Sequence, residues 1–212
     1  MPTQKTIKFD FKKAFKECYG AKPTPSLIRV PPLSFLAIEG SGNPNEPNGD
    51  YQAALQALYT LSYTIKMSKE TKALPAYMDY VVPPLEGLWW SKNPLEKEQF
   101  KWQMMIAQPK FVSHEVLQYA REEAARKKGL DSYNVRLLSI EEGLCAQILH
   151  CGPYDDEPQS MAKLEEFLTR NALVRDSHSR QRTHHEIYLS NPNKTPPHKL
   201  KTILRIPVRA HA

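Results

Sequence analysis

The stretch LCAQILHCGPYDDEP, residues 144–158, decides how this chain folds. Residues 144–151 are apolar enough for a buried strand, and Gly152-Pro153-Tyr154 turns the chain away from it. Pro158 suits the first position of a helix, where its missing N–H leaves no hydrogen bond unmade. The stretch therefore predicts a strand, a glycine-containing loop with a tyrosine, and then a helix.

The same order of elements occurs earlier in the chain. Residues 33–39 are predicted as a strand, and a loop from Gly40 leads to Tyr51 and a helix. The strands expected after the helices lie at 78–82, 87–90 and 101–107 in the first copy, and at 183–189 and 201–206 in the second. Two β-α-β-β repeats would pair into one antiparallel sheet, with helices on one face and a ligand cleft on the other. The sequence therefore predicts an α+β fold.

The domain boundaries follow from these repeats. We expect a lead-in segment at residues 1–26 and one domain at 27–212, with repeats at about 27–110 and about 134–208. Within the second unit, residues 134–140 and 144–151 are apolar runs separated by Glu141-Glu142-Gly143, a pattern typical of a hairpin.

Composition limits the classes of protein to which the chain can belong. It has 212 residues and a net charge of +6, and its apolar runs are far shorter than the roughly 20 residues of a membrane-spanning helix. No apolar core follows the basic start, so a secretory signal is not expected. Cys18, Cys145 and Cys151 form no CxxC pair and suit reduced packing residues. These features predict a cytoplasmic protein.

Motifs for cofactors, metals and nucleic acids are missing from the sequence. The basic residues are dispersed among acidic ones, so no direct nucleic-acid binding is expected. No GxGxxG, Walker loop, GxSxG or HExxH is present. We therefore expect neither a cofactor nor a metal, and the oligomeric state stays open.

One predicted strand carries a candidate site. In residues 184–189, HHEIYL, alternate side chains share a face, so His184, Glu186 and Tyr188 point one way. We expect that face to lie opposite the helices, because the apolar Ile187 and Leu189 point the other way together with His185. A carboxylate beside an aromatic ring is what a ligand site needs, although an exposed strand face is equally consistent.

Aromatic residues on other strands favour the ligand interpretation. Trp89, Trp90 and Trp102 all lie on predicted strands, as do Met104 and His150. One of the neighbouring Trp89 and Trp90 must face away from the helices, and apolar side chains there need a cover. We therefore predict Trp89, Trp90, Trp102, Met104, His150 and His184 as ligand-binding residues around Glu186.

Six segments carry a resemblance to a known family. They are residues 11–19 (FKKAFKECY), 25–28 (PSLI), 87–90 (GLWW), 149–154 (LHCGPY), 184–189 (HHEIYL) and 200–205 (LKTILR). Together they resemble the GyrI-like small-molecule-binding proteins over about residues 8–208, which belong to the SOUL/GyrI superfamily. The resemblance implies two β-α-β-β repeats and a ligand site around a buried glutamate, which matches Glu186. Members usually continue this strand into Asp-Pro-Arg, where this chain has Asn191-Pro192-Asn193.

The resemblance also implies candidate functions. The chain is similar to a stand-alone branch that includes cyclopropanoid cyclopropyl hydrolases, which detoxify DNA-alkylating compounds. On this hypothesis Glu186 is the general base, and Tyr154 or Tyr188 donates a hydrogen bond to the substrate carbonyl. The alternatives are a multidrug-type binder of lipophilic cations, with Glu186 as counter-charge, and a gyrase-interacting protein.

Overall fold

The computed structural model describes residues 8–71, 74, 76–90, 97–130, 132, 134–177, 179 and 181–211, with no side-chain description for residues 70 and 71. The strands are β1 (Ser26–Val30), β2 (Leu33–Ser41), β3 (Leu85–Trp90), β4 (Lys101–Gln108), β5 (Arg136–Ile140), β6 (Gly143–Cys151), β7 (Leu173–Arg175), β8 (His184–Tyr188) and β9 (Lys201–Ala210). Within these ranges they form an antiparallel sheet in the order β1-β6-β9-β8-β3-β4-β2-β5, and β7 pairs with β9.

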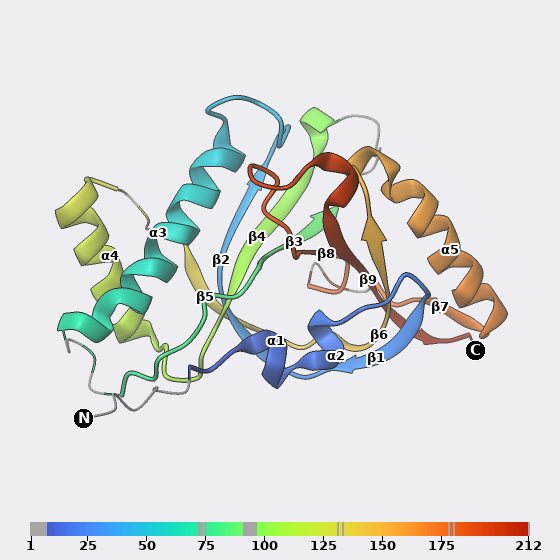
Figure 1. Cartoon of the computed structure of the whole chain (residues 1–212), viewed down its shortest axis with the longest axis horizontal. Helices are drawn as coiled ribbons and strands as arrows, with labels where there is room; N and C mark the ends of the chain where they lie inside the picture. The colour runs from blue at the N-terminus through green and yellow to red at the C-terminus, as the bar shows by residue number, and fades with distance from the viewer. Residues whose placement is uncertain are drawn as a thin grey trace.

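Five α-helices pack around this sheet in the described part of the chain. They are α1 (Phe11–Ala14), α2 (Lys16–Tyr19), α3 (Asp50–Thr71), α4 (His114–Lys128) and α5 (Glu157–Arg170). Short 3-10 turns lie at η1 (Lys97–Gln99), η2 (Tyr154–Asp156) and η3 (Pro197–Lys199). Figure 1 shows α3 and α5 on either side of the central strands, with α4 outside α3 and the short α1 and α2 near β1. Among these helices none is long and apolar enough to cross a membrane.

The two predicted repeats are present as two halves of one sheet. The first consists of β2, α3, β3 and β4, and the second of β6, α5, β8 and β9. Their strands follow the mirrored order β2-β4-β3 and β8-β9-β6, so the halves meet where β3 pairs with β8. Gly87 lies directly opposite Glu186 at this junction. The predicted α+β class with tandem β-α-β-β repeats is confirmed.

Residues 78–82 do not form the predicted strand. Tyr80 makes only an isolated parallel bridge with Phe9, and its side chain is fully buried in the core beside α3. Pro83 and Pro84 follow directly, and they supply no N–H groups with which a ladder could continue. The segment is therefore an extended connection that packs on the core, and strand pairing in the sheet resumes at β3.

The hairpin predicted between residues 134–140 and 144–151 is also wrong. β5 pairs with β2, whereas β6 pairs with β1 and β9. The Glu141-Glu142 connection carries the chain from one end of the sheet to the other instead of reversing it. The Glu142 side chain points into the interior, where it is buried, and this anchors the connection.

The face of the sheet that carries Glu186 differs from the prediction. Glu186 is in register with Gly87 and Leu204, and Gly87 with Met104. Met104 packs in the core cluster of α3, and Leu204 packs in that of α5. Helices α3 and α5 therefore both lie on the face of Glu186, which we call the helix face, and the site lies between them. Alternation separates two faces but does not say which one a helix covers.

The opposite face is covered by the N-terminal segment. Ile187 and Ile203 lie in one buried cluster with Phe11, Cys18 and Tyr19 of α1 and α2. Strand residues are therefore buried on both faces, which explains why the apolar pattern did not distinguish them. This arrangement leaves the central strands with no solvated side.

A charged network is buried within this opposite face. His185 Nδ1 lies 2.9 Å from Glu142 Oε1, and His185 Nε2 lies 3.0 Å from Glu86 Oε2. The Tyr19 hydroxyl donates to Glu86 Oε1 at 2.7 Å, which ties α2 to β3. Since buried charges need partners, the alternating signs along this chain of contacts are what allow it to be buried.

Arg205 completes the buried network. Its guanidinium donates to Glu142 Oε2 at 2.9 Å, to the Cys18 carbonyl at 2.6 Å and to Gln147 Oε1 at 3.2 Å. The Arg205 side chain is only 2% exposed. One cation thus holds the β5–β6 connection, α2 and β6 together.

The buried network should make stability depend on pH. The carboxylates of Glu142 and Glu86 outweigh the effect of burial and raise the His185 pKa from 6.5 to about 9. A raised folded pKa contributes stability fully below pH 6.5, and this contribution is lost as pH rises through about 9. We expect the unfolding midpoint of the wild type to fall across this window. The His185→Gln variant should unfold at a lower temperature than the wild type, and its midpoint should no longer fall with pH across this window. If the midpoint of the variant depends on pH as in the wild type, the dependence does not come from His185.

Candidate functional site

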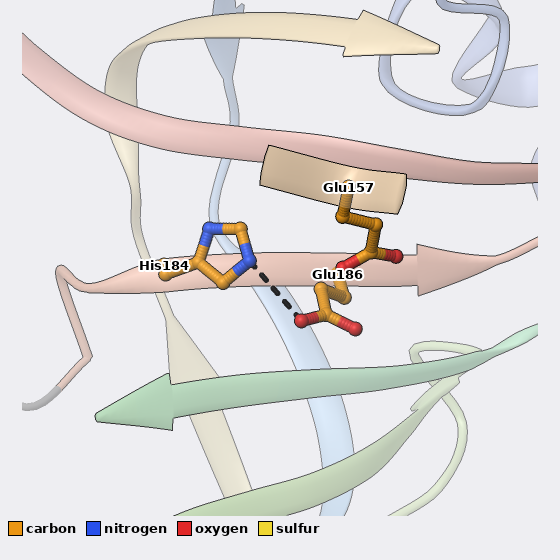
Figure 2. A group of neighbouring side chains, drawn as sticks. All are labelled: Glu157, His184 and Glu186. Atoms are coloured by element: carbon orange, nitrogen blue, oxygen red, sulfur yellow. Dashed lines mark hydrogen bonds and ion pairs between the residues drawn. The ribbon is translucent and has the colours of Figure 1, made fainter. Parts of the chain in front are cut away.

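Strand β8 brings three polar side chains to the helix face, between α3 and α5. The Tyr188 hydroxyl donates to Glu186 Oε2 at 2.7 Å, and His184 Nε2 donates to Glu186 Oε1 at 3.1 Å. The Glu186 side chain is 13% exposed. Both carboxylate oxygens therefore accept a hydrogen bond, which fixes the position of the carboxylate. Figure 2 shows the contact between His184 and Glu186 along the strand.

Trp89 extends this chain of hydrogen bonds from β3. Its Nε1–H donates to the Tyr188 hydroxyl at 2.9 Å, so Tyr188 accepts from Trp89 and donates to Glu186. Gly87 makes room for this contact, because a Cβ there would lie 2.8 Å from Trp89 Nε1. The glycine of the GLWW segment is thus required by the close approach of the indole.

Two further tyrosines surround the carboxylate. Tyr51 lies in the first turn of α3, with its ring centroid 5.9 Å from that of Trp89. Tyr154 lies in η2, with its centroid 6.0 Å from that of Tyr188. Burial first, and then the charge of Glu186, raise the pKa of Tyr51. Tyr51 was not predicted as a site residue, although its position in the repeat matches that of Tyr154 and could have revealed it.

Glu157 is a second carboxyl in the site, and it was not predicted from the sequence. It begins α5, and Figure 2 shows it beside Glu186 and His184. Ligand-type atoms of these three residues lie within 4.8 Å of one another. Burial, followed by the charges of Glu186 and Asp155, raises the Glu157 pKa to about 9. Glu157 is therefore a neutral acid at pH 7, and it lies beside the carboxyl of Glu186.

The remaining tyrosines of the site stay protonated. Burial and the neighbouring Glu186 raise the pKa of Tyr188 well above its usual value. Burial and the charges of Glu157 and Glu186 raise the pKa of Tyr154 to about 12. Tyr154 is 38% exposed, so it forms the outer wall of the site and keeps a proton that it can donate.

His150 supports the site from behind. Its Nε2 lies 2.9 Å from the Pro153 carbonyl, and its Nδ1 lies 2.9 Å from Ser160 Oγ. The carbonyl can only accept, so Nε2 carries a proton and donates it. Gly152, with φ +141°, allows the sharp turn that comes next. His150 therefore positions the turn that carries Tyr154 and Glu157, and its ring nitrogens are already bonded.

The other predicted ligand-binding residues lie at different depths. Trp90 faces the opposite side and packs in the cluster of α1 and α2, so Trp89 is the tryptophan on the side of Glu186. Trp102 and Met104 are on the helix face but are at most 1% exposed beneath α3. Trp102 supports Tyr51 edge-on, with a centroid distance of 5.4 Å. Their assignment as ligand contacts stays a prediction.

The trio of Glu157, His184 and Glu186 offers atom types that metal ions use. In this structure, however, hydrogen bonds already engage both Glu186 oxygens, and Glu157 is neutral at pH 7 because of its raised pKa. A metal needs deprotonated ligands. A metal bound here would therefore have to displace the proton of Glu157 and the hydrogen bonds that Glu186 accepts.

Two cavities lie away from these residues. One of about 260 Å³ is lined by Leu74, Ala76, Phe111, Ser113, Glu115 and Val116. The other, of about 520 Å³, is lined by Ala37, Ile38, Glu39, Gln103, Asn134, Arg136, Leu138, Ser179 and Gln181. Neither includes a residue around Glu186, where aromatic rings contact one another directly.

The chain is similar in fold to three solved structures, and two of them are also similar to it in sequence. A protein from Listeria innocua described as an uncharacterized conserved protein has 43% identity and a TM-score of 0.90, over 95% of this chain and 100% of that chain. A hydrolase from Listeria innocua has 43% identity and a TM-score of 0.87, with the same coverage. The C-terminal domain of EcmrR shares the fold alone, with 13% identity and a TM-score of 0.53 over 88% of this chain and 98% of that domain.

The family comparison covers nearly the whole chain. Residues 23–209 match the GyrI-like small molecule binding domain. None of the curated proteins compared with the chain matches it. The match includes both repeats and every residue of the site around Glu186. The chain therefore belongs to the GyrI-like small-molecule-binding domain family.

Proposed function

We propose that this chain binds a small, flat, lipophilic compound against Glu186 and opens it by hydrolysis. The observation that carries the proposal is the Glu186 carboxylate, held by His184 and Tyr188 and surrounded by aromatic rings. Such rings can stack on a flat molecule, and the carboxylate can act as a base. Two hydrolases from Listeria innocua with 42–43% identity support a hydrolytic function.

The substrate class that we propose is a reactive cyclopropanoid, a strained ring conjugated to a carbonyl. Water attacks a ring carbon and forms a C–O bond while a ring C–C bond breaks. The released electron pair moves through the conjugated system to the carbonyl oxygen, which takes up a proton. Only water is added, and neither oxidant nor reductant is needed. The product has lost its strained ring and can no longer alkylate DNA, so we propose detoxification in the cytoplasm.

The side chains divide the proton transfers between them. Glu186 takes the proton from the attacking water as general base. Tyr154 donates a hydrogen bond to the carbonyl oxygen, because the Tyr188 hydroxyl already donates its hydrogen bond to Glu186. Trp89 and Tyr51 form the aromatic surface on which the substrate stacks. These roles assign the donor to Tyr154 rather than to Tyr188.

A second candidate is a binder of lipophilic cations without catalysis. The observation that favours it is the grouping of Tyr51, Trp89, Tyr154 and Tyr188 around one carboxylate. Aromatic faces attract cations, and Glu186 would balance the ligand charge. The two candidates use the same site and differ only in whether the bound molecule is converted or stays intact.

Substrate depletion by pure protein separates the two candidates. We expect the protein to convert an aromatic cyclopropyl dienone to its water adduct in heavy-oxygen water, with one labelled oxygen in the product. Catalytic amounts of protein should consume a molar excess of substrate. A stoichiometric complex with intact substrate would refute hydrolysis and favour the cation-binding function instead.

A further inference from the structure

The Glu186 site contains a pair of carboxyls whose oxygens are satisfied unequally. Glu186 accepts hydrogen bonds on both oxygens, at 2.7 Å from Tyr188 and 3.1 Å from His184. Glu157 Oε1 is fully buried and, among the described residues, has no hydrogen-bond partner. His184 Nδ1 is also buried without a partner there. Two buried polar atoms at one site are therefore unsatisfied, although such atoms are normally paired.

These contacts indicate which of the two carboxyls is protonated. Two carboxylates so close together and partly buried cannot both ionise at neutral pH. Glu186 accepts hydrogen bonds on both oxygens, whereas Glu157 Oε1 has no partner among the described residues. Glu157 therefore holds the proton, in agreement with the rise of its pKa to about 9. The unliganded pair carries one negative charge and one acid proton.

We infer that Glu157 determines ligand specificity, and that the Glu157–Glu186 pair prefers flat aromatic cations with at least two N–H donors, such as aryl amidines. One N–H of an amidinium would bond to Glu186 and the second to the unsatisfied Glu157 oxygen. The planar fork of such a cation matches two carboxyls better than a cation without N–H groups does. The aromatic rings of Tyr51 and Trp89 suit its flat body.

Binding of such a cation should release the proton of Glu157. The groups that face Glu157 are Tyr154 and Asp155 of its own turn, and His184, Glu186 and Tyr188 of β8. Within the described residues, the cation that forms an ion pair with this turn is Lys97, which lies 3.6 Å from the largely exposed Asp155. An amidinium that donates one N–H to each carboxyl would therefore bring its positive charge into contact with Glu157 and let it ionise, whereas a cation without N–H groups makes no such contact.

Two monocations of similar shape provide the test. Biphenyl amidine carries N–H donors, whereas N-methyl phenylpyridinium carries its charge without any. Calorimetric titration of each, in two buffers of different ionisation enthalpy at about pH 8, gives both affinity and proton release. The variants are Glu157→Gln and Glu157→Ala, with Glu186→Gln for the site itself and Asp155→Asn as control for a nearby charge.

The wild type should bind the amidine about tenfold or more tightly than the pyridinium, since only the amidine can form charge-assisted hydrogen bonds to the two carboxyls. Proton release should accompany the amidine only, and its affinity should rise from pH 6 to 8. Glu157→Gln and Glu157→Ala should abolish the release and lower amidine affinity about tenfold, with pyridinium affinity unchanged. Asp155→Asn should keep the preference for the amidine.

This inference rests on the proposed ligand site at Glu186, and the outcomes separate the two. Equal binding of both probes to the wild type, amidine binding without proton release, or full amidine affinity in Glu157→Ala would overturn the inference. If Glu186→Gln still weakens both probes in those cases, the ligand site at Glu186 stands. Unchanged affinity of Glu186→Gln for both probes would overturn the site and the inference together.

Discussion

Arg205→Met should destabilise the fold by about 3–5 kcal/mol, the usual effect of removing one partner from a buried ion pair. The Arg205 side chain is 2% exposed and binds Glu142, Gln147 and the Cys18 carbonyl. Methionine fills a similar volume but leaves the Glu142 carboxylate with only part of its compensation. Urea unfolding followed by tryptophan fluorescence measures the loss.

Arg209→Met is the matched control for this prediction, because Arg209 lies on the same strand. Its guanidinium is 57% exposed and lies 3.9 Å from Asp176, a distance typical of a weak surface pair. We expect Arg209→Met to change the unfolding free energy by less than about 1 kcal/mol. Similar losses in the two variants would show that the buried network does not stabilise the fold as described.

A double variant tests the cause of the Arg205 effect. In Arg205→Met with Glu142→Gln, the carboxylate that the arginine compensates is also removed. The double variant should regain part of the stability lost in Arg205→Met, because an uncompensated buried charge is the costly element. If the two losses simply add, lost packing rather than charge explains the first result.

The order of the elements could be predicted because its signals are local. Gly152-Pro153-Tyr154 and the apolar period of 3.6 residues act within a few positions of the chain. The covered face could not be predicted in this way. Met104 and Ile187 are both fully buried strand residues, yet one packs under α3 and the other under α1 and α2. Which helices pack on each strand residue depends on contacts between segments far apart in the chain.

The same limit applies to the site. Alternation along β8 was enough to group Glu186 with Tyr188 and His184. Glu157 gave no comparable signal, because an acidic residue in the first turn of a helix ordinarily balances the helix dipole. Its role follows only from its tertiary neighbours on β8. The match between Tyr51 and Tyr154 in the repeat was a usable signal, since both begin the segment after a glycine-containing loop.

The two faces of β8 connect the stabilising network to the site. His185 points into the buried network, while His184 and Glu186, its neighbours on either side, point into the site. The backbone between them is shared, so a shift of His185 would move Glu186 relative to Tyr188. The opposite face therefore does more than stabilise the sheet, because it fixes the strand on which the carboxylate is held.

Glu186→Gln should abolish most of the function while leaving the fold intact. Glutamine has the same shape, and its amide oxygen can still accept from the Tyr188 hydroxyl. It cannot take a proton from water, so we expect hydrolysis to fall by about 10²–10⁴-fold, the usual contribution of a general base. Steady-state turnover of the cyclopropyl dienone measures this, with unfolding monitored alongside. The matched control is Glu166→Gln, which changes an exposed glutamate paired with Arg170 on α5 and should keep full turnover. Turnover at the wild-type rate in Glu186→Gln would refute the role of the base. If the wild type shows no turnover and Glu186→Gln binds lipophilic cations more weakly, Glu186 is a counter-charge instead.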